Sequence, residues 1–563
     1  MESADFLLIF SLVCALLLVA PPMGIYLARV LGEAPFSWLR RVAFVEKGIY
    51  RLCGVDPTEE MNWKSYTGAL LLFSGAGLLF LLAILLLQAY LPLNPAHIEG
   101  MSFSLAINTA ISFVTNTNWQ AYSGEAAASY FTQMVGLGVQ NFLSAATGIA
   151  VFAALARGLA RKETHEIGNF WVDLVRTILY VLLPLSCVIA IVLMSQGVVQ
   201  NFLAYLDATT LEGVSQKIPM GPAASQIAIK QLGSNGGGFF GVNSAHPFEN
   251  PTGLSNAVEI FAMLLLPCAV PFAFGSLVGD RKHGRILFGT MFVMFLCSLG
   301  AALYLESGSI SSLGQLPFIE GKESRFGLGA STLWTVATTV TSNGSVNSMI
   351  SSASPLTGGI AMFNIMLGEV IFGGVGCGIY GMVLFVLLTV FIAGLMVGRT
   401  PEYLGKKIEA PEIKWAVIGV LAPCAVILLF SALACMTQAG ISSLSSAGPH
   451  GLSEILYAFS SAAGNNGSAF GGLNANTPFY NLLMGFGMLI GRFAVLLPVL
   501  RLAGQLACKK HTPPSSGTFP TDSLLFGALL CATILIVGGL TFFPALTLGP
   551  IVEQLLLGQG RFV

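Results

Sequence analysis

Ten long apolar segments divide this chain and constrain its fold more than any other feature. We predict ten membrane spans, at residues 6–27, 66–90, 131–155, 173–195, 255–278, 286–305, 361–398, 415–437, 480–503 and 523–547. Each is long enough to cross a hydrocarbon layer of about 30 Å as a helix. Hydrophobic residues make up 55% of the 563 residues and charged residues only 9%, whereas about a quarter of an ordinary soluble domain is charged. We therefore expect an all-α polytopic protein embedded in a lipid bilayer.

Basic residues predict the orientation of these spans. They gather in the loops after the odd-numbered spans, within residues 29–64, 157–162, 281–285, 399–414 and 501–510. Because cytoplasmic loops carry the excess of Lys and Arg, we predict that these loops face the cytoplasm and that both termini are external. The first segment has no basic region ahead of it and no clear cleavage site, so we interpret it as a retained span and not as a signal peptide.

Four of the predicted external loops share one pattern, a short helix followed by a turn that contains Asn. The short helices are predicted at 102–114, 223–232, 328–340 and 452–463. The four turns hold Thr115, Asn116, Thr117 and Asn118; Ser234, Asn235, Gly236 and Gly237; Ser342, Asn343, Gly344 and Ser345; and Asn465, Asn466, Gly467 and Ser468.

Setting Asn116, Asn235, Asn343 and Asn466 in register predicts a fourfold repeat of span, short helix, turn and span. The repeats are expected at 63–162, 163–282, 283–410 and 411–512, with an N-terminal span and cytoplasmic loop at 1–62 and a C-terminal span and external tail at 513–563.

The chemistry of the four turns favours a monovalent cation. The short helices cannot cross a bilayer, so they are expected to enter it from outside and stop partway. Irregular backbone at that depth is tolerated only where it lines a cavity or is buried in protein. Gly and Asn accept positive φ, which lets successive carbonyl groups face a central pore. One such turn alone is typical of an ordinary loop, but four behind matching helices predict one site for an alkali cation.

Four sequence strings also carry a resemblance to a known family. They are FVTNTNWQAYSGE from Phe113, GSNGGGFFGVNSAHPFENP from Gly233, GRTPEYLGKKIE from Gly398 and NNGSAFGGL from Asn465. The chain resembles the potassium-binding A subunit of the Kdp potassium ATPase over essentially its whole length. The resemblance implies a fold of the Trk, Ktr and HKT superfamily, with four fused units of potassium-channel type, in a bacterial inner membrane.

The same resemblance implies partners and a path for the ion. The expected partners are a catalytic P-type ATPase subunit, a single-span accessory subunit and a very small membrane subunit. Potassium is expected to enter through the filter of this chain and to pass sideways, by a tunnel between subunits, to the ATPase subunit.

By match of motif, the filter residues of the family fall on the Asn116–Thr117, Asn235–Gly236, Asn343–Gly344 and Asn466–Gly467 pairs, with Gln120 as a polar support behind the first turn. The third turn departs from the pattern, since it reads Thr-Ser-Asn-Gly-Ser where members of the family can carry Cys before the Gly.

The seventh span is nearly twice as long as one crossing requires, so it is predicted to be broken. Gly373, Gly374 and Gly376 lie near its middle, where each weakens a helix by about 1 kcal/mol relative to Ala. One interpretation is a loop beneath the filter that turns the ion sideways, and the other is close helix packing through small residues. Glu369, an acid inside this apolar span, is expected to face the pore.

Arg492 lies midway along the ninth span, where an unpaired charge costs at least about 2.5 kcal/mol, so it is expected to face the interior or a wet cavity. It is interpreted either as a fixed positive charge near the ion exit or as half of a structural ion pair, with Glu369 as the candidate partner.

Several common functions are disfavoured by the sequence. It contains no GxxxxGK[ST] phosphate loop and no DKTGT string, so this chain is expected to bind no nucleotide and to have no ATPase activity of its own. The net charge of −1 disfavours a nucleic-acid binder, and the ten cysteines include no CxxC pair. The main alternative is an autonomous Trk- or Ktr-type potassium transporter driven by membrane potential. A secondary transporter with broken helices would show two inverted repeats instead of four in one orientation.

Overall fold

The computed structural model describes residues 3–32, 43–308, 322, 324–368, 370–398, 400–513 and 518–561. Within these residues, ten helices are long and apolar enough to cross a membrane. They are built from α1 (Ser3–Leu31), α3 (Trp63–Leu87), α6 (Val139–Ala160), α7 with α8 (Phe170–Thr177 and Leu183–Ser195), α10 (Gly253–Leu277), α11 (Arg281–Gly308), α14 (Cys377–Val397), α15 (Ala410–Met436), α18 (Pro478–Cys508) and α19 (Leu524–Leu546). The prediction of an all-α protein with about ten transmembrane helices is confirmed.

Four shorter helices lie close to the predicted positions. They are α4 (Phe103–Val114), α9 (Ala223–Leu232), α12 (Gly327–Val340) and α17 (Gly448–Ala463). Most of their residues are buried among the long helices. Each ends at one of the four Asn-containing turns, so its C-terminal carbonyl groups and the negative end of its dipole are directed at that turn.

The seventh predicted span is broken, as expected. A half-helix, α13 (Pro355–Met366), ends before the glycine cluster, and α14 begins after it at Cys377. Of the predicted range 361–398, α14 alone has the length of a span. The described residues between the two helices, 367–368 and 370–376, are irregular.

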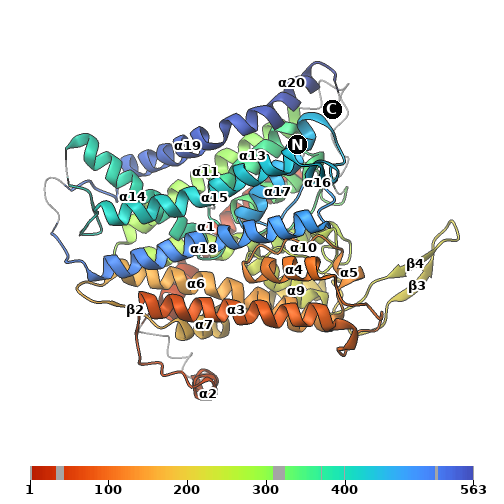
Figure 1. Cartoon of the computed structure of the whole chain (residues 1–563), viewed down its shortest axis with the longest axis horizontal. Helices are drawn as coiled ribbons and strands as arrows, with labels where there is room; N and C mark the ends of the chain where they lie inside the picture. The colour runs from red at the N-terminus through yellow and green to blue at the C-terminus, as the bar shows by residue number, and fades with distance from the viewer. Residues whose placement is uncertain are drawn as a thin grey trace.

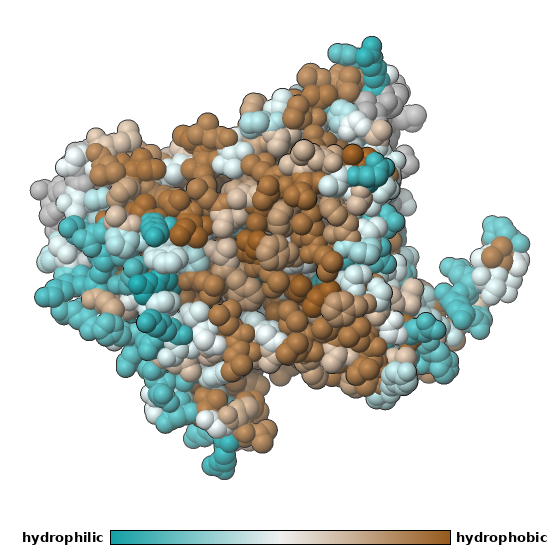
Figure 2. Space-filling view, viewed as in Figure 1, coloured by the Kyte–Doolittle hydropathy of each residue, from teal (hydrophilic) through white to brown (hydrophobic). Residues whose placement is uncertain are grey.

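The long helices run roughly parallel and place the functional elements at one end (Figure 1). In this view α4, α5 (Gly124–Ala127) and α9 lie toward the same end as the hairpin of β3 (Leu206–Thr209) and β4 (Ser215–Ile218), which projects from the body. The first helix begins and α20 (Val552–Gly558) ends toward this end too. Figure 2 shows a hydrophobic band over the middle of the helices, with hydrophilic residues gathered at both ends.

Short elements complete the chain at the two ends of the helices. The strands β1 (Met61–Asn62) and β2 (Glu166–Gly168) pair antiparallel, as do β5 (Glu402–Tyr403) and β6 (Lys406–Lys407). The short helices are α2 (Ala43–Cys53) and α16 (Gln438–Ile441).

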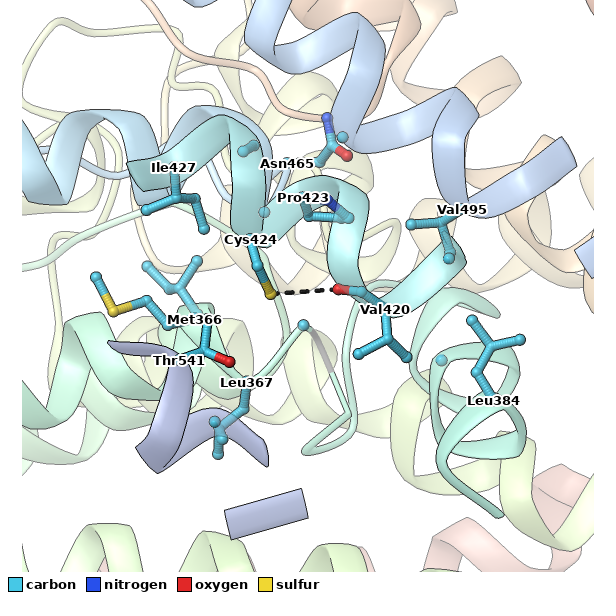
Figure 3. A pocket seen from close by; sticks show the side chains of 18 of the residues that line it. Met366, Leu367, Leu384, Val420, Pro423, Cys424, Ile427, Asn465, Val495 and Thr541 are labelled. Carbon is cyan, nitrogen blue, oxygen red and sulfur yellow. Dashed lines mark hydrogen bonds between the residues drawn. The ribbon is translucent and has the colours of Figure 1, made fainter. Parts of the chain in front are cut away.

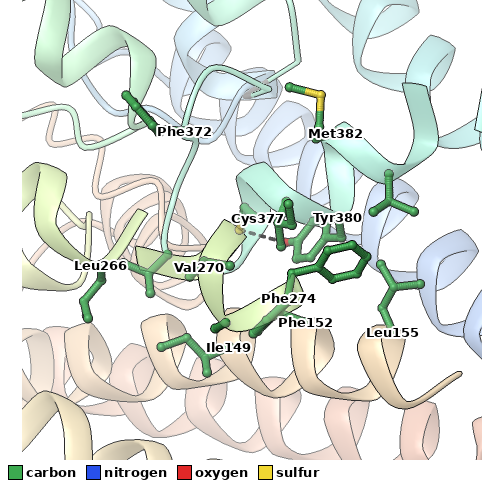
Figure 4. Packing of buried hydrophobic residues seen from close by; sticks show 14 of the residues in the cluster. Ile149, Phe152, Leu155, Leu266, Val270, Phe274, Phe372, Cys377, Tyr380 and Met382 are labelled. Carbon is green, nitrogen blue, oxygen red and sulfur yellow. Dashed lines mark hydrogen bonds between the residues drawn. The ribbon is translucent and has the colours of Figure 1, made fainter. Parts of the chain in front are cut away.

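A buried apolar cluster holds α6, α10 and α14 together (Figure 4). Ile149 and Phe152 of α6 pack with Val270 and Phe274 of α10, and Tyr380 lies beside them at the start of α14. This cluster fixes the irregular segment before α14 against α6.

Candidate functional site

The four turns share one hydrogen-bond pattern. The backbone N–H groups of Thr117, Asn235, Asn343 and Asn466 each donate to the carbonyl group five residues earlier, which belongs to Ser112 (2.9 Å), Lys230 (2.8 Å), Thr338 (3.1 Å) and Ser461 (2.9 Å), respectively. The predicted register was wrong by one residue in the first turn, because Thr117 and not Asn116 occupies the position of the other three asparagines.

The backbone conformation agrees with this corrected register. Positive φ occurs one residue before and one residue after each of these positions, at Asn116 (67°) and Asn118 (54°), Ser234 (51°) and Gly236 (74°), Ser342 (49°) and Gly344 (89°), and Asn465 (51°) and Gly467 (95°). A φ that alternates in sign along a turn lets successive carbonyl groups face the same side of the chain. Asn tolerates the left-handed region better than most residues with a Cβ, which explains Asn118 where the other turns carry Gly.

The turns close into a ring. A Cβ atom added at Gly236 would collide with the carbonyl oxygen of Asn343 in the next turn. A Cβ atom at Gly344 would likewise collide with the carbonyl oxygen of Asn466 in the fourth turn. A Cβ atom at Gly467 would collide with the carbonyl oxygen of Thr117 in the first turn.

The first and second turns are joined by side chains. Asn116 Nδ2 donates to Ser234 O (2.8 Å), and Asn235 Nδ2 donates to Asn116 Oδ1 (2.6 Å). Each turn therefore contacts the next, and the fourth contacts the first.

Hydroxyl groups that the sequence analysis did not single out support two of the turns. Gly344 N–H donates to Thr338 Oγ1 (2.8 Å) and Gly467 N–H donates to Ser461 Oγ (2.9 Å). Asn466 Nδ2 also donates to Thr338 O (2.9 Å), which ties the fourth turn to α12 of the third repeat. A hydroxyl residue six positions before each of these glycines was the available signal in the sequence.

A vestibule opens above the ring. Its lining includes the last positive-φ residue of every turn, which are Asn118, Gly236, Gly344 and Gly467. Gln120 lies in its wall and joins the first two turns, since Gln120 Nε2 donates to Gly238 O (3.2 Å) and Gln120 Oε1 accepts from Gly238 N–H (2.9 Å). Burial lowers the pKa of His246 near this wall, so its ring, stacked on Phe240 with centroids 4.0 Å apart, is biased toward the neutral form.

The broken segment before α14 lies directly beneath the ring. Gly373 N–H donates to the carbonyl of Val340, the last residue of α12 (2.8 Å). Gly376 has φ of 84°, and a Cβ atom there would collide with the backbone of Gly148 in α6. Gly374 lies in the same segment. Glu369, which we expected to face the pore, lies outside the described residues.

Arg492 is buried between this segment and the ring. Its guanidinium donates to Cys377 Sγ (2.8 Å) and to Ser144 O (3.2 Å), and the residue is 5% exposed. The hydroxyl of Ser144 donates to Asn116 Oδ1 (2.8 Å). Ser144 therefore connects Arg492 with the first turn. No local pattern predicts this link, because the three residues lie on separate elements.

Comparison with known proteins identifies the family. The family model described as "KdpA: Potassium-transporting ATPase A subunit" matches residues 10–555. The chain belongs to the KdpA family. A "Potassium-transporting ATPase potassium-binding subunit" of Pseudomonas aeruginosa is 55% identical over 99% of this chain and 100% of the relative. A protein of the same name from Rhodospirillum centenum is 56% identical, with 96% of each chain covered.

A solved structure supports the fold. The crystal structure of the potassium transporter TrkH from Vibrio parahaemolyticus matches with a TM-score of 0.52 and 13% identity, covering 85% of this chain and 97% of that one. The expected resemblance to the KdpA family and to a Trk-like fold is confirmed.

In this KdpA-family chain, an apolar cavity adjoins the ring (Figure 3). Its lining includes Asn465 of the fourth turn and Arg492. It lies between α13, α14, α15, α18 and α19, where Leu367, Leu384 and Ile427 line it.

The groups that converge at the ring are carbonyl, amide and hydroxyl oxygens. Among the described residues, no cluster of three or more His, Cys, Asp or Glu side chains is placed to hold a metal ion. Uncharged oxygens suit an alkali cation, because they replace its hydration shell without the tight electrostatic trapping that carboxylates would cause.

Proposed function

We propose that this chain is the potassium-binding, channel-like subunit of an ATP-driven potassium uptake pump. The observation that carries the proposal is the closed ring of four turns, in which carbonyl oxygens of Thr117, Asn343 and Asn466 lie beside glycines of neighbouring turns. The names of relatives that are 53–56% identical to this chain support potassium as the ion.

In this proposal a potassium ion enters from the external vestibule and exchanges its water shell for oxygens of the ring. The residues of the filter are those of the four turns, 115–118, 234–237, 342–345 and 465–468, with one turn from each proposed repeat. The C-terminal ends of α4, α9, α12 and α17 add negative potential at the same place. Selectivity follows from the number, spacing and field strength of the oxygens.

The ion then leaves sideways toward a separate P-type ATPase subunit. Gly373, Gly374 and Gly376 belong to the segment that obstructs a straight path, and the apolar cavity supplies a lateral one. Arg492 places a fixed positive charge at the mouth of that cavity, where it opposes free leakage of cations. Arg492 and the segment with the three glycines together form the gate of this proposal, and we assign Glu369, which precedes the glycines in the sequence, to the same gate.

The full assembly in this proposal contains the ATPase subunit, a single-span accessory subunit and a very small membrane subunit, in the bacterial inner membrane with both termini of this chain external. The chain itself binds no nucleotide and no nucleic acid. The match to KdpA-family proteins over nearly the whole chain supports a pump subunit over an autonomous Trk- or Ktr-type transporter.

The test is expression with and without the ATPase partner. We expect potassium-stimulated ATPase activity only in the purified complex, and growth of potassium-starved cells only when the partner is present. Rescue of growth by this chain alone would contradict the proposal and support the autonomous transporter.

A further inference from the structure

The second repeat differs from the others at one structurally equivalent position. The carbonyl group that accepts the N–H of the turn belongs to a hydroxyl residue in three repeats, which are Ser112, Thr338 and Ser461, and to Lys230 in the second. Lys230 also accepts the N–H of Gly236 through the same carbonyl (3.2 Å). A lysine therefore anchors the backbone of the second turn where the other turns use Ser or Thr.

The Lys230 side chain is fully buried and forms an ion pair. Its ammonium group contacts Glu249 Oε1, and both side chains are 0% exposed. No solvent screens these charges, so each acts strongly on its surroundings. These charges act on the ring, because Lys230 lies in the last turn of α9, the helix that ends at the second turn.

A chain of hydrogen bonds continues from this pair to the third turn. Ser244 Oγ lies 3.0 Å from Glu249 Oε1 and accepts from Gln231 Nε2 (3.2 Å). Gln231 Nε2 also donates to Glu259 Oε2 (2.8 Å). On its other side, Gln231 Oε1 accepts from the hydroxyl of Ser345 in the third turn (3.0 Å).

Stability alone does not explain this arrangement. Replacing a buried ion pair by neutral residues of similar volume is often neutral or stabilising, whereas removing one partner leaves an uncompensated charge. The three other repeats support their turns with neutral hydroxyl residues at the same position. The pair therefore adds something that a hydroxyl group does not supply, which is a charge beside the ring and a connection between two turns.

We propose that Lys230, Glu249 and Gln231 form a positioning cluster for the ion filter, in which Glu249 neutralises Lys230 behind the second turn and Gln231 holds the third turn in register with it. This inference rests on the proposed function, since it assigns residues that act on potassium binding through the turns. The cluster does not touch the ion. It determines the field and geometry that the ion meets.

The experiment measures ATPase activity of the purified complex, with its ATPase partner, against potassium concentration. Glu249→Gln removes the carboxylate that contacts the Lys230 ammonium, so the half-saturating potassium concentration should rise about tenfold or more, because more of the ammonium charge then acts on the ring in a poorly screened interior. The double variant Lys230→Ser/Glu249→Gln removes both charges of the pair and supplies the hydroxyl found at Ser461, so it should return to within about threefold of the wild type.

A matched control uses another ion pair, far from the ring. Asp173→Asn breaks the pair between Asp173 and Arg157 (2.6 Å). Arg157 also donates to the carbonyl of Ile167 in β2, and β2 lies at the other end of the helices from the β3–β4 hairpin (Figure 1). This variant should lower thermal stability without moving the half-saturating potassium concentration. Gln231→Met removes the connection to Ser345 while both charges stay, so it should raise that concentration by a few-fold even if Glu249→Gln fails to assemble.

The outcomes are distinguishable. A wild-type complex that responds to potassium, together with a Glu249→Gln variant or a Gln231→Met variant of unchanged affinity, would overturn this inference and leave the proposed function intact. A double variant no better than Glu249→Gln would also overturn it, because the effect would then come from lost structure and not from charge. A wild-type complex without potassium stimulation would overturn the proposed function and this inference together.

Discussion

The carbonyl oxygen of Thr117 lies against Gly467, so the first and fourth repeats meet at the turn that each carries. This contact closes the ring, because the second, third and fourth turns already meet in sequence through Gly236 and Gly344. Four segments that lie far apart in the chain thus surround one site, and a lesion in any of them is expected to have the same consequence.

Substitution of the ring glycines tests this common consequence. In Gly236→Ala, Gly344→Ala and Gly467→Ala the methyl group would collide with a carbonyl oxygen of the neighbouring turn, and Ala is strained at positive φ. Each variant should weaken potassium binding by about tenfold or more and relax discrimination against sodium, because one displaced oxygen changes both properties. Gly236→Asp should act most strongly, since it also adds a charge.

The control for these variants is Gly289→Ala in α11, where a Cβ atom meets nothing within 4 Å. Potassium-stimulated ATPase activity, with rubidium, ammonium and sodium as competitors, provides the measurement. Wild-type affinity and selectivity in all three well-folded ring variants would show that the turns do not share a site.

The hydroxyl supports provide a milder test of the same ring. Thr338→Val and Ser461→Ala remove the acceptors of the Gly344 and Gly467 N–H groups, and an unsatisfied buried N–H costs about 1–3 kcal/mol. We expect the half-saturating potassium concentration to rise about five- to tenfold in each. Thr290→Val is the matched control, because the Thr290 hydroxyl donates to the carbonyl of Ile286 in its own helix, and not to a turn of the ring. An equal effect in the control would assign the change to general destabilisation.

Arg492 should affect transport more than binding. Arg492→Gln removes the charge that contacts Cys377 and weakens the link to Ser144, so ATP hydrolysis should become less tightly coupled to uptake, by about threefold or more in ions per ATP. Arg501→Gln on the same helix, whose guanidinium lies over Trp63 at 4.4 Å from the ring centroid, should keep normal coupling. Rubidium uptake and ATP hydrolysis, measured together in vesicles, give the number of ions transported per ATP. Normal coupling in Arg492→Gln would remove it from the gate.

The docking of α20 should depend on pH. The carboxylate of Glu553 accepts a hydrogen bond from His450 Nδ1, 2.8 Å from Glu553 Oε1, and this raises the pKa of His450. Because the folded pKa is above the usual value near 6.5, this stabilisation is complete below pH 6.5 and is lost as the pH rises through the raised pKa. Hydrogen exchange in α20 should therefore accelerate at higher pH beyond the intrinsic chemical rate. His450→Gln should abolish this additional acceleration and leave only the intrinsic pH dependence of exchange. An exchange profile identical to that of the wild type would contradict the assignment to His450.

Topology is tested by reporter fusions. A reporter after Lys407 should be cytoplasmic, and reporters at Ala447 or after Arg561 should be external, because the basic loops follow the odd-numbered spans. An external reporter after Lys407, or a cytoplasmic C-terminus, would overturn the predicted orientation.

Much of the fold was predictable from the sequence because membrane spans depend on length and hydropathy, which a single chain displays directly. The four short helices and the break before Cys377 were predictable for the same reason. The register of the first turn was not, since Asn116 looks like the other asparagines and the offset shows only in the folded backbone, in the hydrogen bond from Thr117 N–H to Ser112 and in the positive φ of Asn116 and Asn118. The contacts of Ser144, Lys230 and Glu249 depend on how separate elements of the chain meet, and no local sequence pattern predicts that.

Equilibrium binding of radioactive rubidium to the purified, nucleotide-free complex, in the wild type and in Gly344→Ala, measures directly whether the four turns form a potassium site. We expect one saturable class of sites in the wild type that potassium displaces and sodium does not, and loss or marked weakening of that class in Gly344→Ala. Saturable binding of unchanged affinity in Gly344→Ala, or displacement by sodium as readily as by potassium, would contradict the claim that the four turns form a potassium site.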